Sequence, residues 1–322
     1  MGEKLIPGIQ QALMNAFQYT LFYLVFSIPL TLSYRTTKVI NFAHANFITY
    51  GAYVAIFLHG ILGLNIMLVA VIIAFLVTGA IAVLNNVLVF TPLQKRGSSP
   101  AIIMISSMGL WIAYKYLLYM LTDVAHYYTT KNFVSYGRIT YSDVPRGSVG
   151  GIDFSQALVA SLVAAFLVVA LLYLLLEKTK IGRAMRAVAD NPSLAEISGI
   201  PRSLIVNLTW FICGGIVGMG GVIWTSFSGA ITPEAGDSMI LQVFTVGFIG
   251  GLVSLLRTGI GAALIATIEN VGIAILNTYF GIPVSFRPFL TFATLITTLI
   301  AFPPLGAGGG LPYRFLRRRS EK

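Results

Sequence analysis

Apolar stretches with few charged residues, each long enough for a membrane-spanning helix, recur along most of this 322-residue sequence. A helix of about 20 apolar residues spans the ~30 Å hydrocarbon core of a bilayer. Only 10% of the residues are charged, whereas soluble domains carry about 25%. The chain therefore lacks the polar side chains that would cover its apolar surface in water. The sequence predicts an all-α fold, a polytopic transmembrane helix bundle.

We expect about eight to nine spans, within a single transmembrane domain that covers residues 1–322. The nine candidate spans run from Ile9 to Ser33, Val39 to Leu58, Leu64 to Phe90, Ala101 to Leu121, Gln156 to Leu176, Ser203 to Ser228, Met239 to Leu256, Thr258 to Phe280 and Pro288 to Phe302.

The positive charge is divided unevenly between the loops. The net charge of +10 would suit a nucleic-acid partner, but the Lys and Arg residues lie between apolar spans. This is the pattern by which membrane proteins fix their orientation. If residues 178–202 face the cytoplasm, 15 Lys and Arg residues fall inside and five outside. We predict the N-terminus outside, the C-terminus inside and no nucleic-acid partner. The inside set ends with Arg314, Arg317, Arg318, Arg319 and Lys322.

Two hydrophilic loops are long. The predicted external loop, residues 122–155, is rich in Tyr, Gly and Asp. It is either an ordered cap between spans or a docking surface for an external partner. The predicted cytoplasmic loop, residues 178–202, carries more specific signals.

The predicted cytoplasmic loop contains residues that typically begin and end a short helix. Asn191 suits the N-cap, Pro192 the first helical position and Gly199 the left-handed position after the last turn. A helix of about two turns from Pro192 to Ser198 is marginal alone. It is either an amphipathic connector lying on the membrane or a helix that docks into a partner protein. Three apolar side chains of this helix would be exposed unless something covers them: Leu194, Ala195 and Ile197.

The sequence contains no G-x-x-x-x-G-K-[ST] phosphate-binding loop and no cluster of metal-ligating residues. We therefore expect no bound cofactor, no metal site and no catalytic residue in this chain. If the chain works with ATP, another subunit must hydrolyse it.

Three separated motifs carry a resemblance to a known family. The first is Ala195-x-x-x-Gly199, which resembles the EAA loop of ABC importer permeases, with Ser193-Leu194-Ala195 in place of Glu-Ala-Ala. The second runs from Ile40 through His44 to Tyr50–Tyr53, and the third covers Phe244–Leu252. Together they are similar to the branched-chain amino-acid branch of these permeases. The sequence departs from that branch at Ala45-Asn46, where Gly-Glu is common.

The resemblance implies a non-enzymatic permease subunit in the cell membrane of a prokaryote. It implies two ABC ATPase subunits that bind ATP and Mg²⁺, a second permease subunit, identical or homologous, and an external substrate-binding protein. It implies transport of branched-chain or other hydrophobic amino acids. It places ATPase coupling on the cytoplasmic loop, where the residues concerned are Arg183, Leu194, Ala195, Glu196 and Gly199.

Polar side chains in the second predicted span are candidates for the substrate path. Asn41, His44 and Asn46 are costly in hydrocarbon unless they face protein or water. Asn41 and His44 are three positions apart and would share one helix face. A hydrogen bond between helices and a place on the substrate path are both open for these residues.

Glu269 is the most specific single candidate for the substrate path. It lies near the middle of the eighth predicted span, where a charged side chain costs on the order of 3 kcal/mol. Asn270 borders it, and Gln242 of the seventh predicted span completes the candidate path. A structural role for Glu269, protonated or hydrogen-bonded between helices, is the alternative. Lys115 is different, because it is predicted to reach the outer interface as an anchor.

Glycines recur four residues apart at Gly214 and Gly218, and at Gly247 and Gly251. Small residues at this spacing let helix backbones approach closely. We expect helix packing at these positions, either within one subunit or between two subunits across a translocation path.

Two other functions remain open at this level. Urea or a short amide is an alternative substrate, since related permeases share the motifs. A secondary transporter driven by an ion gradient is the alternative of a different class, with Glu269 and His44 as a proton relay.

Overall fold

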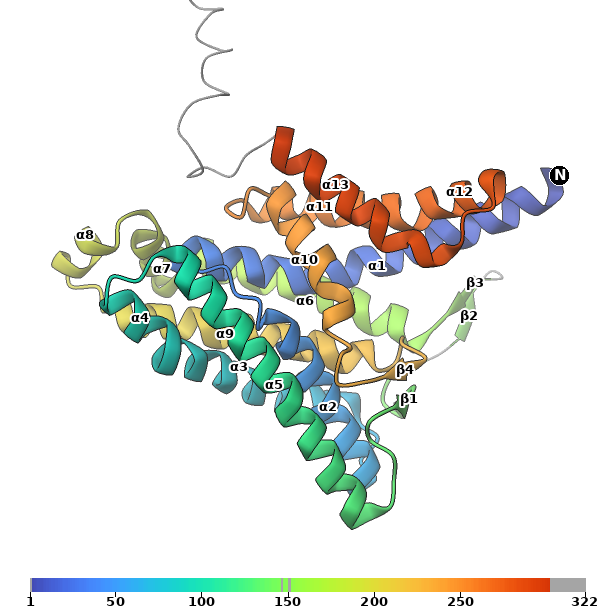
Figure 1. The fold of residues 1–322 in the computed structure, drawn as a ribbon, viewed down its shortest axis with the longest axis horizontal. Coiled ribbons are helices and arrows are strands. Elements are labelled where there is room, and N and C mark those ends of the chain that lie inside the picture. The colour runs from blue at the N-terminus through green and yellow to red at the C-terminus, as the bar shows by residue number, and fades with distance from the viewer. Residues whose placement is uncertain (1, 146, 150–151, 302–322) are drawn as a thin grey trace, which may run out of the picture.

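The structure, a computed structural model, describes residues 2–145, 147–149 and 152–301, and the described chain is a bundle of helices with four short strands at one end (Figure 1). The elements in chain order are α1 (Gly2–Thr37), α2 (His44–Leu62), α3 (Met67–Asn85), η1 (Asn86–Phe90), α4 (Thr91–Lys95), α5 (Pro100–Thr129), β1 (Tyr136–Gly137), β2 (Gly147–Val149), β3 (Ile152–Phe154), α6 (Gln156–Lys178), α7 (Lys180–Asp190), α8 (Pro192–Ile197), α9 (Arg202–Trp224), β4 (Ala230–Ile231), α10 (Asp237–Ile249), α11 (Leu255–Thr267), η2 (Ile268–Gly272), α12 (Ile273–Phe280), η3 (Val284–Phe286) and α13 (Arg287–Ala301).

Among the described residues, seven helices are long and apolar enough to cross a membrane. Two of them are continuous through several elements, from Met67 to Lys95 and from Leu255 to Phe280. The all-α polytopic bundle is therefore as predicted, but two of the nine predicted spans are shorter apolar helices, Asp237–Ile249 and Val284–Ile300. At 1.5 Å per residue, a helix of 13 residues is about 20 Å long and does not cross ~30 Å of hydrocarbon.

The predicted span from Met239 to Leu256 is wrong as a single helix. Its helix, α10, ends at Ile249, and a turn follows in which Gly251 (φ +68°) and Leu252 (φ +55°) both have left-handed backbone. Two such residues in succession cannot continue a right-handed helix. Gly251 is also not a packing glycine, because a Cβ atom built there would have no neighbour within 4 Å. Its role is to let the chain turn into α11.

The second predicted span begins five residues later than predicted. Lys38 has a φ of +58°, which ends α1, and residues 38–43 are not helical. Asn41 lies in this buried connection, where its Oδ1 accepts a hydrogen bond from the backbone N–H of Ala43 at 3.0 Å. This local turn competes with helix formation. Asn41 and His44 therefore do not share a helix face, because only His44 is in α2.

Two of the long helices contain a π-helical turn at buried polar residues. One is η1, which begins at Asn86, and the other is η2, which contains Glu269 and Asn270. A π-helical turn is a locally widened turn that often occurs at functional sites. These turns rotate polar side chains relative to the regular helix, so their orientation does not follow from helical spacing.

Close contact between backbones holds the centre of the bundle. Gly214 and Gly218 of α9 lie against Thr78 and Ala82 of α3, where any Cβ atom would clash. Gly51 of α2 lies equally close to the backbone of Gly218. The structure thus places the Gly214-x-x-x-Gly218 pair inside one chain. Gly247 of α10 faces Leu30 of α1 and Leu252, also within the chain.

The loops gather at two opposite ends of the bundle (Figure 1). The end of α4 and the helices α7 and α8 lie at one end, and the four strands lie at the other. β1 pairs antiparallel with β4, and β2 with β3. These are the ends predicted as cytoplasmic and external. The orientation itself stays a prediction from charge, and five of its residues (Arg314, Arg317, Arg318, Arg319 and Lys322), together with Arg146, lie outside the described residues.

The described part of the predicted external loop is ordered against the helices. Asp143 accepts hydrogen bonds from the backbone N–H groups of Met67 and Leu68, at 2.7 and 2.9 Å, at the start of α3. The hydroxyl of Tyr141 lies 2.8 Å from that of Thr225, at the end of α9. These contacts fit the ordered-cap interpretation, and a docking role for the loop stays a prediction.

Candidate functional site

Glu269 is completely buried, and side chains from two other helices bond its carboxyl group. The hydroxyl of Tyr23 in α1 donates to one carboxyl oxygen, and that of Thr291 in α13 donates to the other. The widened turn of η2 aims the carboxyl group between these helices. A buried carboxyl group needs such partners, because an unpaired one is strongly destabilising in an apolar setting.

Two of the other predicted path residues lie near this carboxyl group. Gln242 of α10 faces Glu269, and its Oε1 is buried without a hydrogen-bond partner. Asn270 donates from Nδ2 to the carbonyl of Ala266 at 2.8 Å, and its Oδ1 also has no partner. Buried acceptors without donors are rare in folded proteins. The Glu269 centre, which we define as Tyr23, Gln242, Glu269, Asn270 and Thr291, therefore retains unused hydrogen-bonding capacity.

His44 and Asn46 point to different neighbours and not to Glu269. The Nε2 atom of His44 lies 2.9 Å from the carbonyl oxygen of Phe26 in α1, and the ring is almost fully buried. Asn46 donates from Nδ2 to the carbonyl of Trp111 in α5 at 3.0 Å. Both bonds join helices, which is the structural alternative open at the sequence level. The structure does not bring Asn41, His44 and Asn46 together as one polar face.

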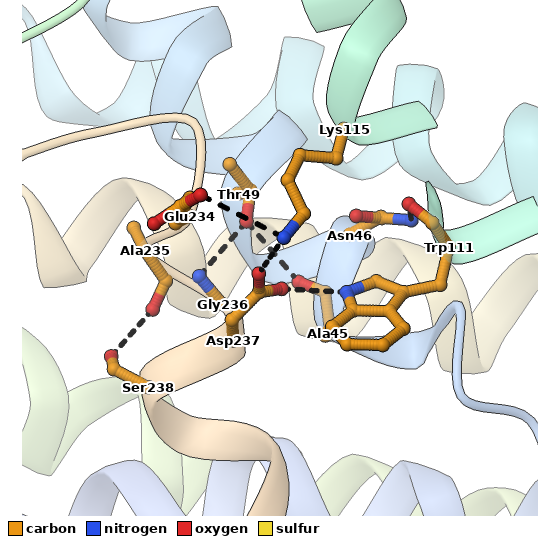
Figure 2. A network of polar contacts seen from close by, with 10 residues as sticks. All are labelled: Ala45, Asn46, Thr49, Trp111, Lys115, Glu234, Ala235, Gly236, Asp237 and Ser238. Carbon is orange, nitrogen blue, oxygen red and sulfur yellow. Dashed lines mark hydrogen bonds and ion pairs between the residues drawn. The ribbon is translucent and has the colours of Figure 1, made fainter. Parts of the chain in front are cut away.

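Lys115 lies in a second polar centre that the sequence did not reveal (Figure 2). Its ammonium group is 2.7 Å from Asp237 and 3.8 Å from Glu234, and 5.0 Å from the centre of the Trp111 ring. Helix α5 continues to Thr129, beyond the predicted end at Leu121, and the anchoring of Lys115 at the outer interface stays a prediction. Lys115 is near the middle of this helix.

The segment before α10 packs closely on α2 at this second centre (Figure 2). The backbone N–H of Gly236 donates to Thr49 Oγ1 at 2.9 Å, and Gly236 approaches the carbonyl of Ala45 so closely that no Cβ fits. Asp237 also accepts a hydrogen bond from Trp111 Nε1 at 2.6 Å. We call Lys115, Trp111, Glu234 and Asp237 the Lys115 centre. Lys115 and Asp237 lie far apart in the sequence, and no local sequence pattern indicates that they are in contact.

The short helix α10 links the two centres. It begins at Asp237, which belongs to the Lys115 centre, and five residues later carries Gln242, which belongs to the Glu269 centre. Helices that stop within the membrane are typical of transporter binding sites, because their ends present polar groups at depth. The half-length helix therefore carries one polar side chain of each centre, Asp237 and Gln242.

The predicted cytoplasmic loop, residues 178–202, is helical over most of its length. The predicted short helix is present as α8, with Asn191 Oδ1 accepting from the N–H of Leu194 at 3.0 Å and Gly199 at a φ of +81°. A second helix, α7, was not predicted. Its N-cap is Thr179, whose hydroxyl accepts from the N–H of Gly182 at 3.0 Å. That cap and the buried spacing Gly182, Met185, Val188 are the signals that would have found it.

Four of the five predicted coupling residues are exposed. Leu194 is 60% exposed, and Arg183, Glu196 and Gly199 are also at the surface. Glu196 forms a loose ion pair with Arg202 at 4.0 Å. Ala195 is the exception, since it is only 3% exposed and packs within the chain. The expectation that it would need a covering partner was wrong, whereas Leu194 and Ile197, 84% exposed, are uncovered.

Comparison with known proteins identifies the family. The family described as "Branched-chain amino acid transport system / permease component" matches residues 12–299. The chain belongs to this family. It is a multi-pass integral membrane protein of the prokaryotic plasma membrane and a permease component of a branched-chain amino acid ABC transporter. The resemblance read from the three motifs is confirmed.

Individual relatives match over nearly the whole chain. A probable branched-chain amino acid transport permease protein LivH from Methanocaldococcus jannaschii is 30% identical over 95% of this chain and 90% of its own. The high-affinity branched-chain amino acid transport system permease protein BraD from Pseudomonas aeruginosa is 26% identical over 93% of this chain and 95% of its own. Both matches extend over nearly the full length of this chain and of the relative.

One solved structure has a similar fold. PsaBC from Streptococcus pneumoniae, in complex with a Fab, superposes with a TM-score of 0.50 over 99% of this chain and 100% of that one, at 14% identity. At this identity the likeness concerns the fold alone.

Proposed function

We propose that this permease moves branched-chain or other hydrophobic amino acids along a path that passes α10. The observation that carries the proposal is the position of α10 between two intramembrane polar centres, with Lys115 at its start and Glu269 beside its middle. Ionisable residues inside membrane spans are rare, and they mark substrate or ion pathways in many transporters.

The charges of the Lys115 centre favour an amino acid over urea. Lys115 is 18% exposed and paired with Asp237, whereas Glu234 is 56% exposed and only 3.8 Å from the same ammonium group. An ammonium group has three donors, so Lys115 retains donors for a substrate carboxylate. Glu234 is free to accept the substrate ammonium group. A zwitterion requires both signs of charge, and neutral urea requires neither.

The partners belong to the same proposal. Two ATPase subunits would bind ATP and Mg²⁺ and engage α8, a second permease subunit would complete the path, and an external protein would deliver substrate. This chain would bind no cofactor and hydrolyse nothing. The exposed Leu194 and Ile197 support a docking role for α8, because a two-turn helix with apolar side chains in water is unfavourable without a partner.

The test is uptake by proteoliposomes that contain the complete complex, with leucine and urea compared at equal concentration. We expect ATP-dependent uptake of leucine, and none of either substrate by this chain alone. Uptake by the chain alone that an ionophore abolishes would instead identify a secondary transporter. Uptake of urea but not leucine would overturn the substrate assignment.

A variant pair tests the Lys115 centre within that assay. Glu234→Gln should raise the KM for leucine about fivefold, the factor for losing one exposed charge contact of roughly 1 kcal/mol. Asp123→Asn removes an exposed carboxylate from the same helix as Lys115 and should leave the KM unchanged. If the wild type, Glu234→Gln and Asp123→Asn have the same KM for leucine, Glu234 does not contact the substrate.

A further inference from the structure

A groove of about 860 Å³ lies between α1, α6, α7 and α11, and no residue of either polar centre is among those that line it. Its walls are apolar along most of their length, formed by residues such as Leu24 and Ile28 of α1, Leu172 of α6 and Ile260 of α11. Within a membrane, the acyl chains of lipids are compatible with an open apolar groove, because they bring no polar group that would need a hydrogen bond.

The chemistry of the groove changes along its length. On α1 its lining runs from Leu24 to Arg35, and on α6 from Val169 to Glu177, so both walls pass from apolar to charged in the same direction. Eleven residues of helix correspond to about 16 Å, close to half the thickness of a bilayer. The charged end is the one at which α7 lies, as Arg186 of α7 also lines it. The groove therefore has the polarity of one membrane leaflet.

One positive charge at this end is in excess. Arg186 lies 3.3 Å from Glu177, which neutralises the pair. Over the described residues, no carboxylate lies within ion-pair distance of Arg35, which is partly buried at the mouth of the groove. A guanidinium group binds a phosphate well because its N–H donors match two phosphate oxygens.

We propose that the groove binds an anionic phospholipid from the leaflet on the α7 side. One acyl chain lies along Leu24, Ile28 and Leu172, and the phosphate group contacts Arg35. The excess charge selects an anionic headgroup, because a Lys or Arg side chain near a membrane surface contributes about a fivefold preference for anionic over zwitterionic lipid. The headgroup would then sit between α1 and α7.

The test is native mass spectrometry of the purified chain with equal amounts of phosphatidylglycerol and phosphatidylcholine that carry identical acyl chains. We expect one retained phosphatidylglycerol, preferred about fivefold. Arg35→Gln should abolish this preference while a lipid of either kind is still retained. Arg96→Gln removes an exposed arginine outside the groove and should leave the preference intact.

A second variant tests the acyl-chain half of the groove. At Gly259 a Cβ atom would meet only Leu24 Cδ2, at 3.6 Å, so Gly259→Leu fills the groove without disturbing the backbone. It should remove the retained lipid of either headgroup. No preference in the wild type, or an equal loss in Arg96→Gln, would overturn the proposal. A dimer mass that Gly259→Leu abolishes would overturn it also, by assigning the groove to a second copy of the chain.

Discussion

Tyr23 of α1 donates its hydroxyl hydrogen to the carboxyl group of Glu269, which lies 246 positions later in the chain. Thr291 of α13 donates to the other oxygen of the same group. The carboxyl group of Glu269 thus joins α1, at the start of the chain, to η2 and α13 near its end. The neighbouring Gln242 gives α10 a side chain on this junction. A change in the hydrogen bonding of Glu269 would therefore alter the surroundings of Gln242, and so of α10, the helix that we place on the substrate path.

Glu269→Gln should lower transport while leaving the complex assembled. The amide has the shape of the carboxyl group, but only its oxygen accepts hydrogen bonds. One of the two hydroxyls, of Tyr23 or Thr291, then faces an NH₂ group; its oxygen can accept from that group, but its own hydrogen loses its acceptor. We expect a loss of about 1–3 kcal/mol in unfolding free energy, the usual effect of one unpaired buried group. Leucine uptake per assembled complex and denaturant unfolding measure the two effects.

Tyr23→Phe is the matched control for Glu269→Gln, because it removes one donor and leaves the carboxyl group. A structural role alone predicts that both variants lose stability and neither loses uptake per folded complex. A role in the path predicts that Glu269→Gln loses uptake beyond what Tyr23→Phe loses. If uptake per folded complex is unchanged in both across the pH range, Glu269 is a packing residue.

The features that sequence predicted well are those governed by local rules. Apolar length and low charge indicated the bundle, and Asn191, Pro192 and Gly199 indicated α8 because capping depends on a few neighbouring residues. The failures involve partners far away in the chain. The ion pair between Lys115 and Asp237 joins residues 122 positions apart, and no local pattern contains it.

A second group of failures comes from backbone breaks inside apolar sequence. Lys38 and Leu252 adopt left-handed conformations, although neither residue type favours them. Hydropathy does not detect these breaks, so residues 39–43 and the turn after α10 were predicted as helix. For the same reason, hydropathy did not show that α10 is too short to span the membrane. The proposed path depends on this feature.

The ion pair between Lys115 and Asp237 should show energetic coupling. Lys115→Met keeps the apolar length of the side chain but leaves Asp237 without its ammonium partner in a site only 21% exposed. We expect each single change, Lys115→Met or Asp237→Asn, to cost about 2 kcal/mol, between the values for exposed and buried pairs. The double variant should cost less than the sum. Denaturant unfolding of all four proteins measures this cycle, and strictly additive costs would mean that the pair is not formed.

The contact between α9 and α3 should tolerate no methyl group at Gly214. A Cβ atom there would lie 2.5 Å from that of Ala82 and 2.8 Å from the carbonyl oxygen of Thr78. Gly214→Ala should therefore lower the unfolding free energy by about 1–3 kcal/mol through overpacking. Gly109→Ala is the control, since Gly109 is helical and has no neighbour within 4 Å. It should be neutral or slightly stabilising, because Ala favours helix over Gly. Equal effects of the two would show that α9 does not lie this close to α3.

The last prediction concerns the exposed face of α8. Leu194→Asp would place a charge where we propose an apolar contact with an ATPase subunit, and an unpaired charge buried at an interface is strongly unfavourable. Gly199→Val would strain the turn at a φ of +81° and re-aim the helix. Each should leave the permease folded but lose the ATPase subunit on co-purification, or lose substrate-stimulated ATP hydrolysis. Ser193→Asp is the control, because it adds the same charge to the first turn of α8, where the helix dipole favours it. Normal transport by both Leu194→Asp and Gly199→Val would make α8 a connector and leave the ATPase to dock elsewhere.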